Sequence, residues 1–404
     1  MNQASEQLPE TMRVAVLAPF LIASVVLAAA YGSSFLLPDY LLAIKLSGIS
    51  AGSIMSAGMV ATIVCASTAG WFAQRYGVVQ TASLAAFMMA AAMLCLAAAP
   101  LATPLAYLGG MLLGASWSVY FILAPLQLIH YLRPAARIKY LTLLSGSQMA
   151  GLGLAAPIGH LVAQSTGSFS LVYIGLATCC VIATACLDLT RRRMRDDPHM
   201  AMKSVVLTPA SALTIMRAKT GIPIVMIALA ACVFTGLSTY QSAYANSRGL
   251  RPETFFVTFT VVAVLLRFSI AAFVNKIPVA RLALGLILLT LVSLALYVAN
   301  SGNYGLYIGS TAAFALGYGL SYATLNAMAV NLAERMELPV AITSQAFTIG
   351  YFVGLLGFPY FAEMLVSHHG VDAMLYAMGL LMVLNIALLG VMYPRAWMRP
   401  VAPN

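Results

Sequence analysis

Apolar runs of about 20 residues recur along the whole 404-residue chain, separated by short polar stretches. A helix of about that length crosses a hydrocarbon core roughly 30 Å thick. Hydrophobic residues make up 62% of the chain and charged residues only 8%, whereas the surface of a soluble globule needs more polar groups than this. The sequence therefore predicts an all-α polytopic membrane protein embedded in the lipid bilayer.

Twelve transmembrane helices are expected from these runs. Their ranges are 14–37, 48–72, 79–98, 105–130, 140–163, 169–189, 221–243, 254–275, 282–300, 304–331, 341–365 and 373–393. One long polar and basic stretch divides the spans six and six. We therefore expect an N-terminal six-helix half over 1–190, a basic cytoplasmic linker over 191–220, and a C-terminal six-helix half over 221–404.

The positions of the basic residues predict the orientation in the membrane. With the N-terminus inside, only Lys45, Arg248 and Arg251 of the 21 Lys and Arg residues fall in outer loops, and cytoplasmic loops are those that collect such residues. Both termini are thus predicted to be cytoplasmic. This bias accounts for the net charge of +10, so no nucleic-acid partner is inferred. The chain has no Asn-x-Ser/Thr glycosylation acceptor, in keeping with a bacterial inner membrane.

Polar hinges after the second and eighth spans indicate an internal duplication. At one constant offset three pairs align: Gln74-Arg75 with Asn275-Lys276, Trp117 with Tyr318, and Phe121 with Tyr322. Spans five and eleven each carry a Ser-Gln pair, Ser147-Gln148 and Ser344-Gln345, followed by glycines and a proline. Repeats related by an axis along the membrane normal are typical of transporter halves. We therefore expect the two six-helix halves to be pseudo-symmetric.

Two such halves, a basic central linker and a hinge after spans two and eight resemble the major facilitator superfamily of transporters, over nearly the whole chain. In that family the loop after span two carries a Gly-x-x-x-Asp-Arg-x-Gly motif. Gly70, Arg75 and Gly77 match it, and Gln74 stands in place of the acidic residue. The resemblance implies gating roles for these four residues and a chain that works as a monomer.

The second half and span five carry further parts of the resemblance. Asn275-Lys276 stands where the second copy of the hinge is expected, again with an amide in place of the acid. The stretch GLGLAAPIGH, 151–160, keeps the glycines and Pro157 of the family's antiporter signature without its full pattern. The resemblance implies gating roles for Asn275, Lys276 and Pro157. Span four lacks the buried arginine of many proton-linked drug exporters, which weakens the antiport interpretation.

Arg267 is the only basic residue expected well within a span. An ionisable group there is costly and is a functional candidate by default, and a cationic centre favours a substrate that carries a carboxylate or similar anion. A long side chain can equally reach the cytoplasmic hinge or hold an inner gate. Both roles for Arg267 stay open.

Three residues are candidates for proton coupling. Asp39 and Glu363 lie near the outer ends of spans one and eleven, and His160 lies within span five. A carboxylate in a low-dielectric site can cycle a proton between the two sides, and histidine is the side chain that changes charge nearest neutral pH. The alternatives are that the acids cap helices or meet headgroups and that His160 is a satisfied core residue.

Aromatic and amide side chains gather on the spans expected to line a central cavity. Such a set suits a semi-polar organic ligand, although any one member can instead pack a helix interface or form part of an interfacial belt. Together with Arg267 they make up the predicted substrate site: Tyr31, Phe35, Trp117, Tyr120, Phe121, Gln127, Tyr240, Gln241, Tyr318, Tyr322 and Asn326.

Motifs for catalysis are missing from the sequence. It has no P-loop and no His/Cys/Asp cluster with metal-ligand spacing, so we expect no enzyme activity, no cofactor and no metal. The sequence predicts a secondary active transporter that exports a small amphipathic organic compound by alternating access, in exchange for protons. The alternative is a proton-coupled symporter or a uniporter for an organic anion bound by Arg267.

Overall fold

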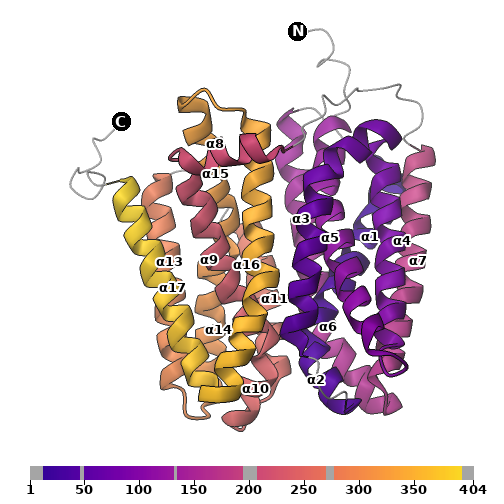
Figure 1. Cartoon of the computed structure of the whole chain (residues 1–404), viewed down its shortest axis with the longest axis vertical. Helices are drawn as coiled ribbons and strands as arrows, with labels where there is room; N and C mark the ends of the chain where they lie inside the picture. The colour runs from indigo at the N-terminus through magenta and orange to yellow at the C-terminus, as the bar shows by residue number, and fades with distance from the viewer. Residues whose placement is uncertain (1–11, 46–49, 132–133, 194–206, 270–276, 394–404) are drawn as a thin grey trace.

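The structure is a computed structural model of the chain, and it describes residues 12–45, 50–131, 134–193, 207–269 and 277–393 (Figure 1). All regular elements in these ranges are helices, in the order α1 (Val14–Gly32), η1 (Ser33–Leu36), α2 (Leu37–Ala43), α3 (Ala51–Tyr76), α4 (Val78–Ala97), α5 (Thr103–Tyr131), α6 (Pro134–Thr166), α7 (Phe169–Arg193), α8 (Pro209–Arg217), α9 (Gly221–Thr239), α10 (Gln241–Ser247), α11 (Pro252–Ser269), α13 (Val279–Ala299), α14 (Tyr304–Gly319), α15 (Ser321–Arg335), α16 (Val340–His369) and α17 (Val371–Met392).

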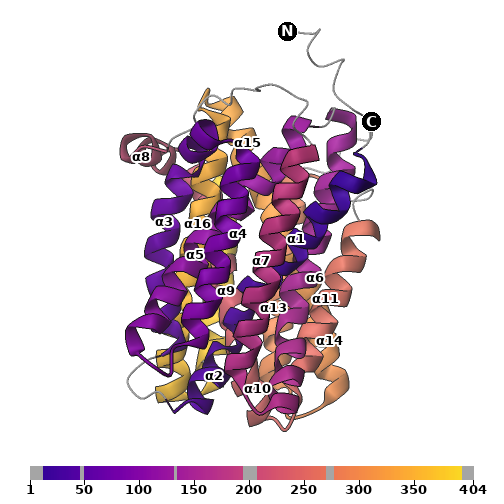
Figure 2. The same cartoon turned by 90° about the vertical axis from the view of Figure 1, so that its right-hand side faces the viewer.

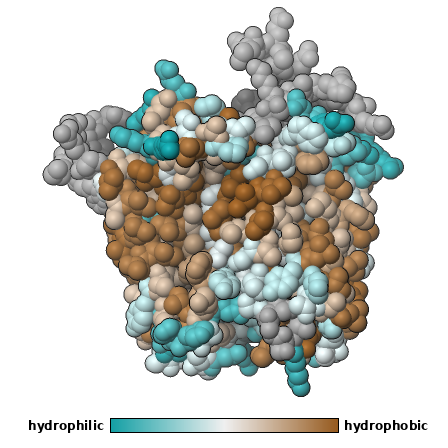
Figure 3. Space-filling model, in the orientation of Figure 1, coloured by the Kyte–Doolittle hydropathy of each residue, from teal (hydrophilic) through white to brown (hydrophobic). Residues whose placement is uncertain are grey.

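The long helices run side by side between two ends of the molecule (Figures 1 and 2). Helix α8 lies across one end, which we call the linker end, while α2 and α10 lie at the opposite end, which we call the far end. Apolar side chains cover most of the middle of the visible face and hydrophilic ones gather at both ends (Figure 3). That distribution is what a lipid belt around the helices requires.

Ten helical segments in the described part of the chain are long and apolar enough to cross a membrane. They include a first segment that continues past the predicted end at residue 37, because the turn η1 passes directly into α2, which ends at Ala43. The run predicted as 304–331 is divided at Leu320 into α14 and α15, where Gly317 and Gly319 weaken the helix. Helix α11 is described only as far as Ser269. A count of twelve spans thus stays a prediction.

The helices pack as two groups (Figure 1). Helices α1–α7 form the N-terminal group, in which α3 packs on α5 and α1 packs on α6, and α9–α17 form the C-terminal group, in which α9 packs on α16 and α13 packs on α14. The groups meet along two seams, α3 against α16 and α6 against α11. The linker between them is not uniformly irregular, since it contains α8, which Thr208 caps by accepting a hydrogen bond from the Ser211 N–H.

Two glycines bring helices into close contact at equivalent places in the two groups. A Cβ added to Gly151 of α6 would overlap the carbonyl oxygen of Val25 in α1, and one added to Gly354 of α16 would overlap that of Ala228 in α9. Small residues let the backbones of transmembrane helices approach one another in this way. Gly151 and Gly354 therefore act in packing within each group.

Replacing Gly354 is expected to destabilise the fold. Gly354→Ala forces α16 away from α9, and overpacking of this kind costs about 1–3 kcal/mol of unfolding free energy. Gly390→Ala in α17 is the matched control, because no atom lies within 4 Å of the added Cβ, and the higher helix propensity of alanine favours it. Thermal unfolding of the purified protein measures both. A Gly354→Ala protein as stable as Gly390→Ala would contradict the close approach.

Candidate functional site

A cavity of about 480 Å³ lies between the two groups of helices. Its lining comes from the parts of α3, α5, α6, α15 and α16 nearer the linker end, and it reaches the middle of the bundle at Tyr318 of α14 and Phe259 of α11. The volume is in the range of sites for small organic ligands. The remaining lining residues are Gly70, Phe121, Ile122, Pro125, Leu126, Leu141, Leu144, Ser145, Gln148, Met149, Gly319, Tyr322, Asn326, Ser344, Gln345, Thr348 and Tyr351.

The described lining of the cavity carries no charged side chain. Its polar character comes from hydroxyl groups and from three amides, Gln148, Asn326 and Gln345. Each amide leaves one buried atom without a hydrogen-bond partner: Gln148 Nε2, Asn326 Oδ1 and Gln345 Oε1. Buried polar atoms in native proteins are nearly always paired, so these atoms are available to a ligand or to water.

Three aromatic rings from both groups meet at the wall of the cavity. Phe121 of α5 lies edge to face with Tyr322 of α15, 5.8 Å between centroids, and nearly parallel to Tyr351 of α16 at 6.0 Å. Tyr322 and Tyr351 contact each other at 5.1 Å. Phe121 and Tyr322 are the pair that aligns in the sequence repeat, and equivalent residues of a two-fold repeat contact each other where the axis passes.

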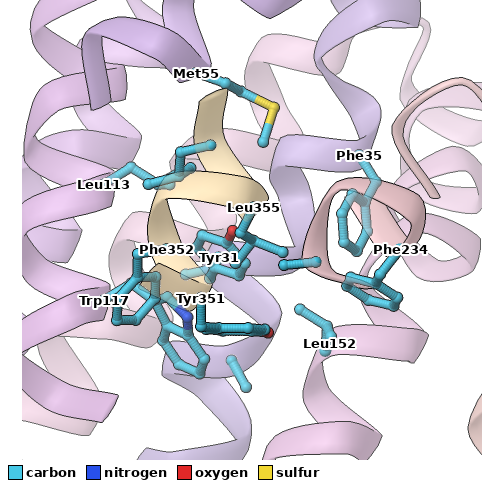
Figure 4. Close-up of a cluster of buried hydrophobic side chains, with 14 of the residues drawn as sticks. Tyr31, Phe35, Met55, Leu113, Trp117, Leu152, Phe234, Tyr351, Phe352 and Leu355 are labelled. Carbon is cyan, nitrogen blue, oxygen red and sulfur yellow. The ribbon is translucent and has the colours of Figure 1, made fainter. Parts of the chain in front are cut away.

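Buried aromatic side chains, among them Tyr31, Phe35, Trp117 and Phe234, pack together as a layer inside the bundle (Figure 4). Tyr31 stacks on Trp117 at 5.0 Å between ring centroids. Phe35 of the N-terminal group contacts two rings of the C-terminal group, Phe234 at 6.0 Å and Phe256 at 5.8 Å. All five residues are at least 95% buried, so contacts between rings close the path along the middle of the bundle.

Beyond this layer, a cluster of ionisable groups joins the two groups of helices. Nε2 of His160 lies 3.0 Å from Oδ2 of Asp39, and its Nδ1 lies 3.4 Å from Oε1 of Glu253. Asp39 also accepts a hydrogen bond of 2.7 Å from the Ser242 hydroxyl. Asp39 and His160 belong to α2 and α6, whereas Glu253 and Ser242 belong to α11 and α10. We call these four residues the imidazole cluster.

A second polar contact closes the far end on the other seam. The Glu363 carboxylate of α16 accepts a hydrogen bond of 2.8 Å from the Gly52 N–H at the start of α3. The Tyr240 hydroxyl donates to the Pro359 carbonyl at 2.8 Å and lies 3.3 Å from the same carboxylate. A carboxylate is well placed there, because the first N–H groups of a helix have no partner within the helix.

The two contacts occupy equivalent positions of the repeat. Asp39 corresponds to Tyr240 and Glu253 to Gly52 at the offset that aligns Phe121 with Tyr322, and His160 corresponds to Glu363 to within two positions. The two contacts therefore lie on the two different seams, the imidazole cluster on α6 against α11 and the Glu363 contact on α16 against α3. The copies differ in chemistry, since one centres on an imidazole between two carboxylates and the other on a single carboxylate.

The structure brings only part of the predicted substrate set to the cavity. Phe121, Tyr318, Tyr322 and Asn326 line it, as does the predicted gating residue Gly70. The other described members pack away from it. They are Tyr31, Phe35 and Trp117 in the aromatic layer, Tyr120 with its hydroxyl on Ser24, buried Gln127, Tyr240 beside Glu363, and Gln241, which donates to the Tyr307 hydroxyl.

The predicted hinge residues are described only in part. Gln74 and Arg75 are exposed at the end of α3, where the Arg75 guanidinium lies 5.7 Å from the Trp71 ring centre. Gly77 follows them with φ of 91°, a backbone conformation that favours glycine. Pro157 is buried within α6. Asn275 and Lys276 lie outside the described residues, and so does the Arg267 side chain, although its backbone belongs to α11.

Several lining or cluster residues did not appear in the predicted site. Tyr351, Gln148 and Gln345 line the cavity, and Glu253 and Ser242 complete the imidazole cluster. The repeated Ser-Gln pair was a sequence signal for the two glutamines. Glu253 gave none, because an acid at the start of a predicted span is the ordinary choice for a helix N-terminus. Within the described residues, no three or more His, Cys, Asp or Glu side chains are placed so that they could hold a metal ion together.

Comparison with known proteins agrees with this arrangement. Residues 19–357 match the family model of the Major Facilitator Superfamily. The chain belongs to this superfamily. A search of curated protein sequences finds no match. Among solved structures, the POT family transporter PepTSo superposes with a TM-score of 0.75 at 13% identity, over 96% of this chain and 100% of that one. An auto inhibited POT family peptide transporter superposes with a TM-score of 0.67 at 14% sequence identity, over 96% of this chain and 98% of that one.

Membership of the superfamily fixes the general activity. The chain is a multi-pass membrane protein and a secondary transporter of a small-molecule substrate, and it is not an enzyme. The two solved structures are too distant in sequence to say more than that the fold is shared.

Proposed function

We propose that this superfamily member exports a small amphipathic organic compound from the cytoplasm in exchange for protons, working as a single chain in a bacterial inner membrane. The observation that carries the proposal is the pairing of an uncharged cavity toward the linker end with a far end closed by titratable groups. The two groups of helices would be the two pseudo-symmetric six-helix halves, and rocking of one against the other would move the solute.

The linker end would face the cytoplasm. The basic residues described there include Arg191, Arg192 and Arg193 at the end of α7 and Arg217 in α8, and such residues concentrate on the cytoplasmic side. In this orientation the cavity lies toward the inside and the far-end contacts close the outside. A cytoplasmic solute would enter between the halves and bind against the rings of Phe121, Tyr322 and Tyr351.

The imidazole cluster would couple this movement to protons. A protonated His160 attracts two carboxylates, one from each half, and so favours a closed far end. Loss of that proton leaves Asp39 and Glu253 facing each other without a cation between them, which favours separation of the halves. Two uncharged groups complete the surroundings of the imidazole. The Phe169 ring lies with its centroid 6.1 Å from that of the His160 ring, and the Ser242 hydroxyl donates a hydrogen bond to Asp39.

In the exchange cycle, His160 would take up a proton while the far end is open to the outside. The far end then closes and the cavity opens to the cytoplasm, where solute binds. The aromatic layer between His160 and the cavity would have to rearrange in this step, so that the proton can pass through the cavity to the cytoplasm. Reopening of the far end releases the solute outside. Glu363 would serve as the second closing contact on the other seam, held by the Gly52 N–H.

Transport in proteoliposomes under an imposed pH gradient tests the proposal. Exchange predicts that solute moves against the direction of proton flow and that collapsing the gradient with an ionophore stops accumulation. Solute movement in the same direction as protons would support symport, and solute movement only down its own concentration gradient would support uniport. In both of these alternatives Arg267 holds an organic anion. Either of those results would overturn the exchange mechanism.

A further inference from the structure

The three unpaired amide atoms of the cavity define the chemistry of what binds there. Gln148 and Gln345 are 93% and 91% buried, and both line the cavity with one atom unpaired. A buried amide atom without a partner has lost its hydrogen bonds to water and gained none in the protein, which costs free energy. A ligand that supplies the missing partners gains that free energy back.

Hydrogen bonding fixes which atom Gln345 presents. Its Nε2 donates to the carbonyl oxygens of Ala66 and Ser67 in α3, at 2.9 and 3.3 Å. The carbonyl oxygen of the Gln345 side chain is therefore the atom left free, and it can only accept. Asn326 presents a second acceptor and Gln148 presents a donor, so the polar part of the ligand needs both an N–H donor and a carbonyl-type acceptor.

The rest of the lining fixes the apolar part of the ligand. Rings of Phe121, Tyr322 and Tyr351 pack at the wall, and aromatic groups prefer stacked or edge-to-face neighbours. No described lining residue offers a countercharge, and an ion in such a place would lose its hydration without a paired partner. The lining is therefore suited to a flat and uncharged molecule.

We infer that the cavity binds uncharged aromatic compounds that carry an amide-type edge, an N–H donor beside a carbonyl acceptor, and that Gln148 and Gln345 determine this specificity. The inference rests on the proposed function, since it takes the cavity as the transport site. Gln345 also links the two halves, because its Nε2 bonds α16 to α3 across one seam. A ligand bound to its carbonyl oxygen therefore contacts a side chain that holds the two halves together.

Equilibrium binding of three matched probes to the purified protein tests the inference. The probes are 2-naphthamide, its N,N-dimethyl derivative, which lacks the N–H donors, and 2-naphthoate, which is an anion at neutral pH. We expect 2-naphthamide to bind about tenfold or more tightly than either of the other probes. The N,N-dimethyl derivative leaves the buried acceptors unpaired, and 2-naphthoate brings a charge that no described lining residue compensates.

Variants then assign the preference to the glutamines. Gln148→Leu should weaken binding of 2-naphthamide about tenfold and leave the thermal stability of the ligand-free protein unchanged or higher, since it removes an unpaired buried amide. A purely structural role predicts the reverse, a less stable protein with normal affinity. Gln345→Leu should show the same loss of affinity. Gln80→Leu, an exposed amide of α4, is the control and should bind normally.

Four results would overturn the inference. They are tighter binding of 2-naphthoate, equal binding of all three probes, no saturable binding of 2-naphthamide, and unchanged affinity in both glutamine variants. The second and third are expected if the amides only hold water. None of these results concerns the direction of proton flow, which the pH-gradient experiment measures separately, so failure of the inference and failure of the proposed exchange mechanism are distinguishable.

Discussion

Asp39→Asn is expected to reduce transport driven by a pH gradient about tenfold or more, while the affinity of the cavity for ligand stays unchanged. The substitution keeps the shape of the side chain and the contact with Ser242, but it removes the charge that lies 3.0 Å from His160. A hydrogen bond to a charged group contributes about 1.5–3 kcal/mol, and each 1.4 kcal/mol is about tenfold in an equilibrium between two states. Transport rates and ligand binding measured on the same preparation separate the two effects.

Asp372→Asn is the matched control for this experiment. Asp372 lies at the same end of the molecule and pairs with Arg248, but both residues belong to the C-terminal group and the Asp372 side chain is 50% exposed. An exposed pair within one group has little effect on how the groups move. If Asp39→Asn transports normally under the gradient, or if Asp372→Asn fails equally, the imidazole cluster is not the coupling site.

Gly153→Ala is expected to reduce transport about tenfold with the protein still folded, and Thr260→Gly in the same chain is expected to restore it. An added Cβ on Gly153 would overlap the Thr260 hydroxyl and lie 2.8 Å from the Thr260 Cβ. Gly153 belongs to α6 and Thr260 to α11, so the clash falls on the seam between the groups. Rotation of the threonine side chain cannot move its Cβ, and overpacking costs about 1–3 kcal/mol.

Two single variants make the rescue interpretable. Gly175→Ala places a methyl group in α7 with no atom within 4 Å and should transport normally. Thr260→Gly alone should lower the unfolding free energy only modestly, by the cost of a glycine within a helix. A double variant as inactive as Gly153→Ala alone would show that the loss does not come from this seam, and a fully active Gly153→Ala protein would show that the seam tolerates the methyl group.

Much of the fold follows from hydrophobic length alone. Apolar runs predict where most helices lie, because a segment in lipid must satisfy its own backbone hydrogen bonds. The division of 304–331 at Leu320 could not be predicted in this way, since a break buried inside the bundle leaves the run apolar. The linker helix α8 is also missed by hydropathy, because it is short and only one of its residues, Ile215, is buried.

The candidate site was harder to predict than the fold. Aromatic residues at helical spacing are equally suited to a cavity wall and to a packed interface, so the sequence placed Trp117 and Phe121 in one set although only Phe121 lines the cavity. The partners of His160 come from residues 39 and 253, and only the packing of α6 against α11 brings Glu253 to it. The repeat was the most informative signal, since equivalent positions form the cavity wall and both far-end contacts.

Distances between spin labels at the two ends test the alternating movement most directly. The labels are attached to a variant in which the native cysteines are replaced. One pair, Leu101→Cys and Ser301→Cys, reports on the far end, and the other, Gln80→Cys and Glu334→Cys, reports on the linker end. All four positions are exposed, and each pair has one label in each group of helices. If the imidazole cluster couples protons to the movement as proposed, raising the pH is predicted to lengthen the far-end distance and shorten the linker-end distance. Asp39→Asn is predicted to abolish this response. Distances that do not respond to pH or ligand, or that lengthen together at both ends, would contradict the account.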